Sequence, residues 1–181
     1  IKKGYAKGYV ISGMVKIKGF KDFKEAKLLF DKAIDIDPKG YQAYLVRGIL
    51  NQQLELYSKA MLDFNEVIKL KPDYALAYFS RGWLRMDDRL VAKNYKSAID
   101  DFSKAINLNS NIASFYLHRG FAKYNLYDNK GACQDVQKGK QVGFSNILND
   151  DFEYLQDGSI NPQMSYFNSE NLPELIKLLC N

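Results

Sequence analysis

The sequence predicts an all-α fold, an α-solenoid of about four antiparallel helix pairs followed by a C-terminal capping segment. A tyrosine is followed four residues later by a glycine at four places, Tyr9/Gly13, Tyr44/Gly48, Tyr78/Gly82 and Tyr116/Gly120. After each glycine comes a varied pattern of small and large residues, Ala26/Phe30/Ala33, Ala60/Phe64/Val67, Ala98/Phe102/Ala105 and Ala132/Val136/Gly139. The glycines lie 35, 34 and 38 residues apart. Self-similarity near this period is typical of helical repeat arrays.

Each unit divides into two helices, most clearly in the second unit. Residues 41–53 carry an apolar stripe at helical spacing, formed by Tyr44, Leu45, Gly48 and Ile49. A second stripe runs from Ser58 and is ended by Pro72, because the residue before a proline disfavours the helical conformation. A mid-helix glycine costs about 1 kcal/mol relative to alanine. Four such glycines at one helical phase therefore indicate that the two helices of each unit cross closely.

The same division gives units at residues 5–38, 41–74, 75–112 and 113–143, with the capping segment at residues 144–181. One extra residue near Lys18–Gly19 predicts a loosened turn in the first unit. Four extra residues within 89–94 amount to about one helical turn, so we expect the third helix pair to lengthen without changing phase. Within the capping segment we expect a short helix at 149–156, a loop at 157–163 and a capped helix at 169–179 that covers the open edge of the array.

These patterns resemble the tetratricopeptide repeat family over roughly residues 7–143. The second unit matches best, with Tyr44, Gly48, Ala60, Phe64 and Pro72 all in place. The fourth unit resembles the final repeat of bacterial members, where the array begins to close off. The resemblance implies stacked helix pairs in a right-handed superhelix, with the first helix of each pair lining the concave side.

An arginine directly precedes the repeat glycine in three units, and an aspartate directly precedes the Phe or Val of the second helix in the same three. The first unit has neither, since Ser12 and Leu29 stand at those positions. This joint occurrence predicts three charge pairs, Arg47–Asp63, Arg81–Asp101 and Arg119–Asp135. We prefer this structural role to anion binding by the arginines. A partly buried pair fixes geometry more surely than it adds stability.

The resemblance also implies a binding surface, because ligands of the family touch side chains three residues before the repeat glycine and one residue after it. Here these positions and the following turn are mostly apolar. The candidate partner-binding residues are Leu45, Ile49, Phe79, Trp83, Met86, Leu117, Phe121 and Tyr124. Trp83 and Phe121 hold the same phase on consecutive first helices and form the predicted centre. The alternative is that these side chains pack between neighbouring first helices.

One binding mode of the family is not expected here. Its carboxylate clamp for chaperone tails requires Lys and Asn around the first repeat glycine and Asn in the next unit. This chain has Val10, Met14 and Val46 at those positions. Binding of chaperone tails by such a clamp is therefore not predicted.

Composition and titratable residues give no enzymatic signal. Apolar residues make up 46% and charged residues 26% of the 181 residues, and no apolar run approaches the ~18 residues of a membrane span. The only histidine, His118, excludes His-based metal clusters, and a couple with Cys133 lacks an orienting motif. We expect no catalysis, cofactor or metal.

Cys133 and Cys180 are expected to be reduced, partly buried thiols, since a disulfide would require the last helix to dock on the fourth unit.

We therefore expect a non-catalytic module that binds a protein or peptide segment in an apolar and aromatic groove. The alternative is nucleic-acid binding, suggested by the net charge of +5, but the groove positions are apolar and the lysines cluster at one end. A third reading is self-assembly, with the basic first unit of one copy meeting the acidic tail of another. The chain starts at Ile1, so we expect an upstream segment to have been removed, which leaves the cytoplasm or the bacterial envelope as compartments.

Overall fold

The described part of the chain is a row of helix pairs. The computed structural model describes residues 2–87 and 94–143, together with Lys177 and Cys180. Within these residues it contains eight helices and no strand. They are α1 (Lys2–Phe20), α2 (Phe23–Ile36), α3 (Tyr41–Gln53), α4 (Tyr57–Leu70), α5 (Ala75–Leu84), α6 (Tyr95–Leu108), α7 (Ala113–Tyr124) and α8 (Asn129–Val142).

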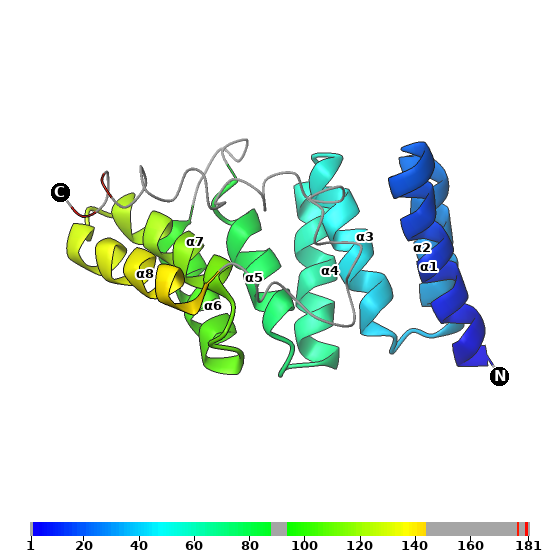
Figure 1. Ribbon diagram of the computed structural model, residues 1–181. Helices are drawn as coiled ribbons and strands as arrows, with labels where there is room; N and C mark the ends of the chain where they lie inside the picture. The colour runs from blue at the N-terminus through cyan, green and yellow to red at the C-terminus, as the bar shows by residue number, and fades with distance from the viewer. Residues whose placement is uncertain (1, 88–93, 144–176, 178–179, 181) are drawn as a thin grey trace.

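The helices pair in chain order and the pairs stack side by side, from α1 and α2 at one end to α7 and α8 at the other (Figure 1). Each second helix also packs against the first helix of the next unit, as α2 does against α3. The first helices of neighbouring units contact one another as well, α1 with α3 and α3 with α5. This contact places the first helices on the inner side of the array, as expected for a helical-repeat solenoid.

The repeat glycines lie where the two helices of a unit cross, as the sequence predicts. A methyl group at Gly48 would lie 2.7 Å from Cε1 of Phe64, and one at Gly82 would lie 3.0 Å from Cε1 of Phe102. Both phenylalanine rings are fully buried, and each contributes about 2–3 kcal/mol through the burial of apolar surface. The two remaining contacts of this kind are those of Gly13 with the ring of Phe30 and of Gly120 with the carbonyl oxygen of Ala132.

Polar caps and left-handed turn residues define where the second helices begin. Asp22, Asn94 and Asp128 each accept a hydrogen bond from the backbone N–H three residues later, at 2.9–3.0 Å. These bonds satisfy amide donors that the first turn of a helix leaves free. The chain turns just before through residues with positive φ, Lys21 (51°) and Tyr127 (62°).

The two expected insertions are placed differently from the prediction. In the first unit Lys18–Gly19 belongs to α1, which continues to Phe20, so the extra residue extends the last helical turn and does not loosen it. In the third unit α5 has only 10 residues and α6 has 14, as α4 does, so the pair is not lengthened. Of the range 89–94, in which the extra residues were expected, only Asn94 is described, and its N–H donates to the carbonyl oxygen of Arg85 at 2.9 Å.

The expectation of two reduced thiols is wrong, because Cys133 and Cys180 form a disulfide with their Cα atoms 4.9 Å apart. Cys133 lies half-buried on α8, so the bond ties the C-terminal cysteine to the fourth unit. The remaining predictions for the capping segment, residues 144–181, fall outside the described residues. Among the described helices none is both long enough and apolar enough to cross a membrane.

Candidate functional site

The first helices are held in place by a row of arginines. Arg47 on α3 donates from Nε to Oδ2 of Asp63 at 3.1 Å and from Nη2 to Oδ1 at 2.6 Å. The same two-pronged contact recurs between Arg81 and Asp101 at 3.0 and 2.6 Å and between Arg119 and Asp135 at 2.8 and 2.6 Å. These are the three pairs expected from the sequence. The planar guanidinium fork matches both carboxylate oxygens, so each contact fixes the distance and the angle between the helices.

A further donor, which the sequence reasoning missed, reaches each aspartate from four residues after the arginine. Asn51 donates to Oδ2 of Asp63 at 2.9 Å, and Lys123 contacts Oδ2 of Asp135 at 2.8 Å. In the third unit the donor is Arg85, at 2.5 Å from Oδ2 of Asp101. The three aspartates are only 3–4% exposed, so several donors are needed to compensate for the loss of water. The constant spacing after the arginine was the only available sequence signal, since the residue types differ.

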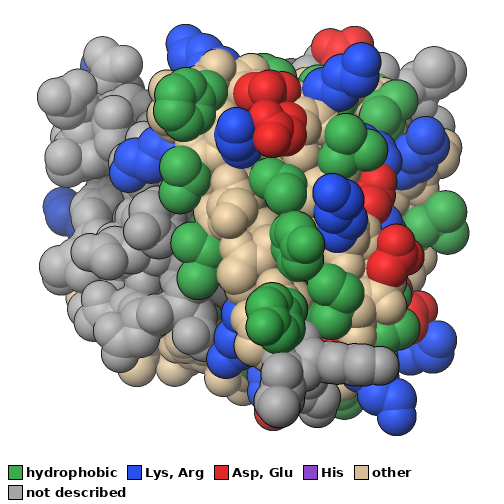
Figure 2. Space-filling model, turned by 90° about the vertical axis from the view of Figure 1, so that its right-hand side faces the viewer, with side chains coloured by type: hydrophobic (Ala, Val, Ile, Leu, Met, Phe, Trp, Pro, Cys, Tyr) green, Lys and Arg blue, Asp and Glu red, His purple; other side chains and the backbone are tan. Residues whose placement is uncertain are grey.

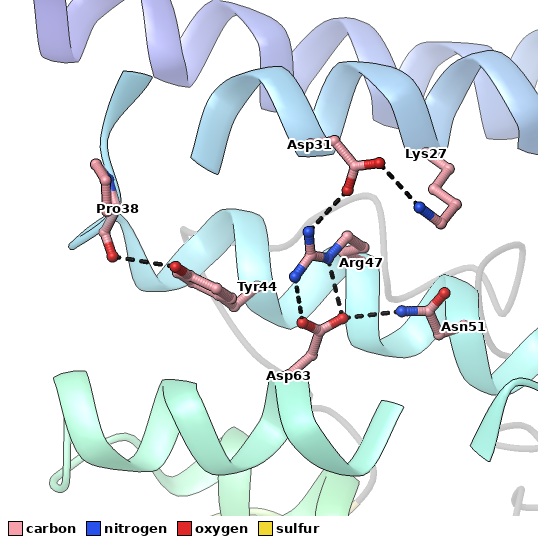
Figure 3. Close-up of polar contacts among 7 residues, drawn as sticks. All are labelled: Lys27, Asp31, Pro38, Tyr44, Arg47, Asn51 and Asp63. Carbon is pink, nitrogen blue, oxygen red and sulfur yellow. Dashed lines mark hydrogen bonds and ion pairs between the residues drawn. The ribbon is translucent and has the colours of Figure 1, made fainter. Parts of the chain in front are cut away.

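The same arginines also connect neighbouring units, which the sequence did not indicate. Nη1 of Arg47 donates to Oδ1 of Asp31 on α2 at 2.7 Å (Figure 3). The corresponding bonds join Arg81 to Oδ1 of Asn65 at 2.8 Å and Arg119 to Oγ of Ser103 at 3.1 Å. Each acceptor immediately follows the large residue of the preceding second helix. We call the arginines, their aspartates and these acceptors the arginine ladder.

The charges on Arg47 and Asp31 in the first rung stabilise each other, whereas burial raises the pKa of Asp63. Burial alone would lower the pKa of Arg47, but its hydrogen bonds to Asp63 and Asp31 outweigh burial and raise this pKa. Burial would raise the pKa of Asp31, but the hydrogen bonds from Lys27 and Arg47 lower it below its usual value. Both groups are therefore ionised at neutral pH. The first rung is a charged link between the first and second units.

The repeat tyrosines brace the other side of the ladder. Tyr44 donates its hydroxyl to the carbonyl oxygen of Pro38 at 3.2 Å, and Tyr78 does the same with Pro72 at 3.1 Å. Tyr116 uses the carbonyl of Ser110 at 3.2 Å, so the bond does not require proline there. Each arginine of the ladder also lies over the ring of the tyrosine three residues before it. The distance from the arginine Cζ to the ring centroid is 5.5–5.8 Å for Arg47 and Tyr44, Arg81 and Tyr78, and Arg119 and Tyr116. Each of these first helices is thus bonded to the second helix of its own unit, to the second helix of the preceding unit and to the turn before it. These contacts fix the position of the first helices relative to one another.

The predicted partner-binding residues fall into two groups by exposure. Leu45, Ile49, Phe79 and Leu117 are at most 1% exposed, so they pack inside the array and offer no surface to a partner. Met86 and Trp83 are 6% and 9% exposed, while Phe121 and Tyr124 on α7 are half-buried. The accessible part of the predicted surface is therefore centred on α7, beside Trp83. An apolar side chain on a first helix can either pack against the neighbouring helices or lie at the surface, and the sequence pattern does not distinguish the two.

An aromatic cluster supports this surface from beneath. His118 lies edge-on to Phe79 and Trp83, with ring centroids 5.0 and 6.3 Å away. Burial lowers the pKa of His118 to about 4, although the backbone hydrogen bond with Ser114 acts in the opposite direction. The imidazole is thus neutral at pH 7 and acts as a packing group. Across residues 2–87 and 94–143, no three His, Cys, Asp or Glu side chains are grouped so that they could hold a metal ion.

Some polar atoms near the inner face lack hydrogen-bond partners within the described residues. Gln52 on α3 is 3% exposed and its Nε2 makes no hydrogen bond. Ser80 on α5 is 2% exposed, and its Oγ also makes no hydrogen bond. Gln52 lies one turn after Ile49, at a position equivalent to Met86 and Tyr124 in the following units. A buried amide without an acceptor costs about 1–3 kcal/mol. Both atoms are buried, so neither is offered to a partner at the surface of the inner face.

The fold and this inner face define an α-solenoid of stacked helix pairs, a class whose members present extended binding surfaces. Residues 41–74 match the family model described as tetratricopeptide repeat, and the other units repeat its Tyr and Gly positions and its pairing of two helices. The chain is a tetratricopeptide repeat protein, and such repeats are protein–protein interaction modules.

Two curated proteins are similar over most of the chain. RNA polymerase II-associated protein 3 of Xenopus laevis is 34% identical over 132 residues, covering 68% of this chain and 18% of that protein. Mitochondrial import receptor subunit TOM70 of Rattus norvegicus is 25% identical over 174 residues, covering 74% of this chain and 28% of that protein. The chain therefore spans less than a third of the length of the curated relatives it matches.

Two solved structures share the fold. MamA from Desulfovibrio magneticus RS-1 superposes with a TM-score of 0.65 at 21% identity, covering 76% of this chain and 75% of that chain. The first repeat domain of Spaghetti (RPAP3), bound to the HSP90 peptide SRMEEVD, superposes with a TM-score of 0.63 at 22% identity, covering 69% of this chain and 95% of that domain. At this level of identity the likeness establishes the fold alone.

Proposed function

We propose that the protein is a non-catalytic interaction module that binds an apolar segment of a partner protein on the inner face of the array. The contact surface is formed by Phe121 and Tyr124 on α7 with the small exposed part of Trp83 on α5. The observation that carries the proposal is the half-buried aromatic pair on α7, placed beside a nearly buried tryptophan. Aromatic anchors at the centre of an interface commonly contribute 2 kcal/mol or more each.

The supporting geometry is the rigid frame behind these side chains. The arginine ladder fixes the first helices, so the inner aromatic side chains are held in position before a partner arrives. Preorganisation of this kind lowers the conformational entropy lost on binding. Because the accessible side chains there are aromatic, the contact with a ligand would be made by its apolar side chains. The ligand is thus an extended or helical segment with large apolar side chains.

The relatives support a binding role but not the same ligand. TOM70 is named as an import receptor, and the RPAP3 domain holds a charged HSP90 peptide. In this chain the corresponding inner positions include Val10, Met14 and Val46, which cannot hold a carboxylate. The binding mode proposed here is therefore apolar contact in place of charge recognition.

A selection from a random peptide library tests the proposal. Trp83 is the only tryptophan, so its fluorescence reports binding at the inner face without a label. Selected peptides should be rich in large apolar residues and should change this fluorescence. The double variant Phe121→Ala with Tyr124→Ala should bind them at least tenfold more weakly, since it removes two anchors.

The matched control is Leu62→Ala, which removes an exposed side chain (69% exposed) from α4. It should bind the selected peptides as the unmodified protein does. Circular dichroism should show both variants to be as helical as the parent. Equal affinity of the double variant and the parent would refute the proposed surface, as would a selection that yields only charged peptides.

A further inference from the structure

Helix α8 is stabilised by less apolar burial than the other three second helices. Those three each bury a phenylalanine ring at the crossing with the first helix of their unit, Phe30, Phe64 and Phe102. At this position α8 has the smaller Val136, and its other buried residues are small or polar: Gly131, Ala132, Asp135 and Gly139. Glycine also weakens a helix relative to alanine. Burial and helix propensity therefore secure α8 less firmly than α2, α4 or α6.

The disulfide joins the chain at this same helix. Cys133 lies on α8 and is bonded to Cys180, 47 residues further along the chain. These are the two cysteines of the sequence, so the first unit, at the opposite end of the array (Figure 2), has no such cross-link. A disulfide stabilises the folded state because it restricts the unfolded chain. The cross-link thus acts on the helix that is least secured by packing.

The surroundings of the two sulfur atoms favour exchange with thiols. Both cysteines are half-buried, so a small thiol can approach them. The Nε2 of Gln137 donates to Sγ of Cys133 at 3.3 Å. Lys130 and Lys177 are exposed, and each lies three residues before one of the cysteines on helical residues. Nearby positive charge and N–H donors stabilise a thiolate, and a stabilised thiolate is the better leaving group in thiol–disulfide exchange.

We propose that the Cys133–Cys180 disulfide is a redox-sensitive lock on the fourth unit, and that its reduction by a dithiol loosens α8 while the second unit stays folded. A thiolate of the dithiol attacks Sγ of Cys180, the Sγ–Sγ bond breaks, and Cys133 leaves as a thiolate beside Gln137. The second thiol of the reductant then displaces the Cys180 thiolate from the mixed disulfide. The dithiol becomes a disulfide, and its two electrons and two protons pass to the two cysteine sulfurs.

Reduction should also weaken partner binding at the inner face, because α8 packs directly against α7. Helix α7 carries Phe121 and Tyr124, the half-buried aromatic pair of the proposed contact surface. Loosening α8 removes one of the two helices between which α7 is packed, so these aromatic side chains are no longer held in place. This consequence rests on the proposed function, whereas the loosening of α8 does not.

Hydrogen exchange followed by mass spectrometry tests the lock on the 181-residue chain. After treatment with dithiothreitol the amides of α8 should exchange about tenfold faster or more, while those of α3 and α4 keep their rates. The variant Cys180→Ala should show the fast exchange without reductant and should not respond to it. Unchanged exchange in α8, or an equal acceleration in α3 and α4, would overturn the proposal.

The rate of reduction tests the role of Gln137. Gln137→Ala should slow reduction by dithiothreitol about threefold or more, because the leaving thiolate loses its N–H donor. The matched control is Gln134→Ala, which removes an exposed amide from the same helix and should leave the rate unchanged. Glutathione trapped in a mixed disulfide should be found on Cys180. Equal rates for the two variants, or glutathione on Cys133, would refute the assignment of Cys133 as the leaving group.

Binding of the selected apolar peptides tests the coupling to the inner face. The reduced protein should bind them about fivefold more weakly or worse, and Cys180→Ala should bind with this lower affinity in both states. Undiminished binding together with faster exchange in α8 would refute the coupling. If the inner face binds no peptide at all, the proposed function fails, while hydrogen exchange and the rate of reduction still decide whether the lock exists.

Discussion

Replacing His118 by leucine should make the stability of the array less sensitive to acid. The folded state holds the His118 pKa at about 4, whereas the ordinary value is 6.5. Between these two values the unfolded chain binds a proton that the folded chain does not. The free energy of unfolding should therefore fall as the pH drops from about 6.5 to about 4, and the whole contribution amounts to about 3 kcal/mol. About 2 kcal/mol of it should already be lost at pH 5.

The assay is urea unfolding followed by circular dichroism at pH 7.5 and pH 5, for the parent and for His118→Leu. No other histidine can mask the effect, because His118 is the only one in the chain. Carboxylates that titrate in this range affect both proteins equally. The informative quantity is the loss of stability between the two pH values, whatever the absolute stability of the variant. If both proteins lose the same free energy, the imidazole is not buried in a neutral state and the reasoning fails.

Three further predictions concern the frame of the array. Gly48→Leu should unfold the array, because the added side chain meets the packed helix crossing and costs more than about 3 kcal/mol. Gly8→Ala should raise the melting temperature slightly, because an added methyl group there meets nothing within 4 Å and alanine favours the helix. Equal melting temperatures of the two variants would contradict this. Asp101→Asn should cost about 3 kcal/mol in urea unfolding, because it leaves two guanidinium groups facing a neutral amide, and an unchanged midpoint would disprove the role of the carboxylate. Reduction should lower the unfolding free energy by up to about 4 kcal/mol through the 47-residue separation of Cys133 and Cys180, and dithiothreitol should then have no effect on Cys133→Ser; an effect there would show that the disulfide is not its target.

The crossings and the charge pairs were predictable because each depends on residue types that recur at one phase. A glycine is required where Phe64 approaches within 2.7 Å of an added methyl group, so the pattern repeats in sequence. Arg47 and Asp63 are both needed for one contact, so they occur or are missing together. Contacts that recur from unit to unit and depend on particular residue types therefore appear in the sequence as residues repeated at one spacing.

The rest of the ladder was hidden because hydrogen bonding is tolerant of residue type. Asn51 and Lys123 perform the same task at equivalent positions, and a search for identical residues passes over them. The disulfide depends on where the C-terminal cysteine lies in space, which no local pattern encodes. The partner surface was predicted too broadly, since an apolar side chain such as Leu117 has the same sequence signature whether it packs against a neighbour or faces solvent.

The rungs of the arginine ladder are not chemically equal. The first junction ends on a carboxylate, Asp31, while the second and third end on the neutral acceptors Asn65 and Ser103. In a solenoid each unit is held by its own stability and by coupling to its nearest neighbours. Screening by salt, or protonation of Asp31, weakens only the first of these couplings. Under such conditions the array should fray from α1 and α2 while the remaining units stay folded, so ionic strength controls where unfolding begins.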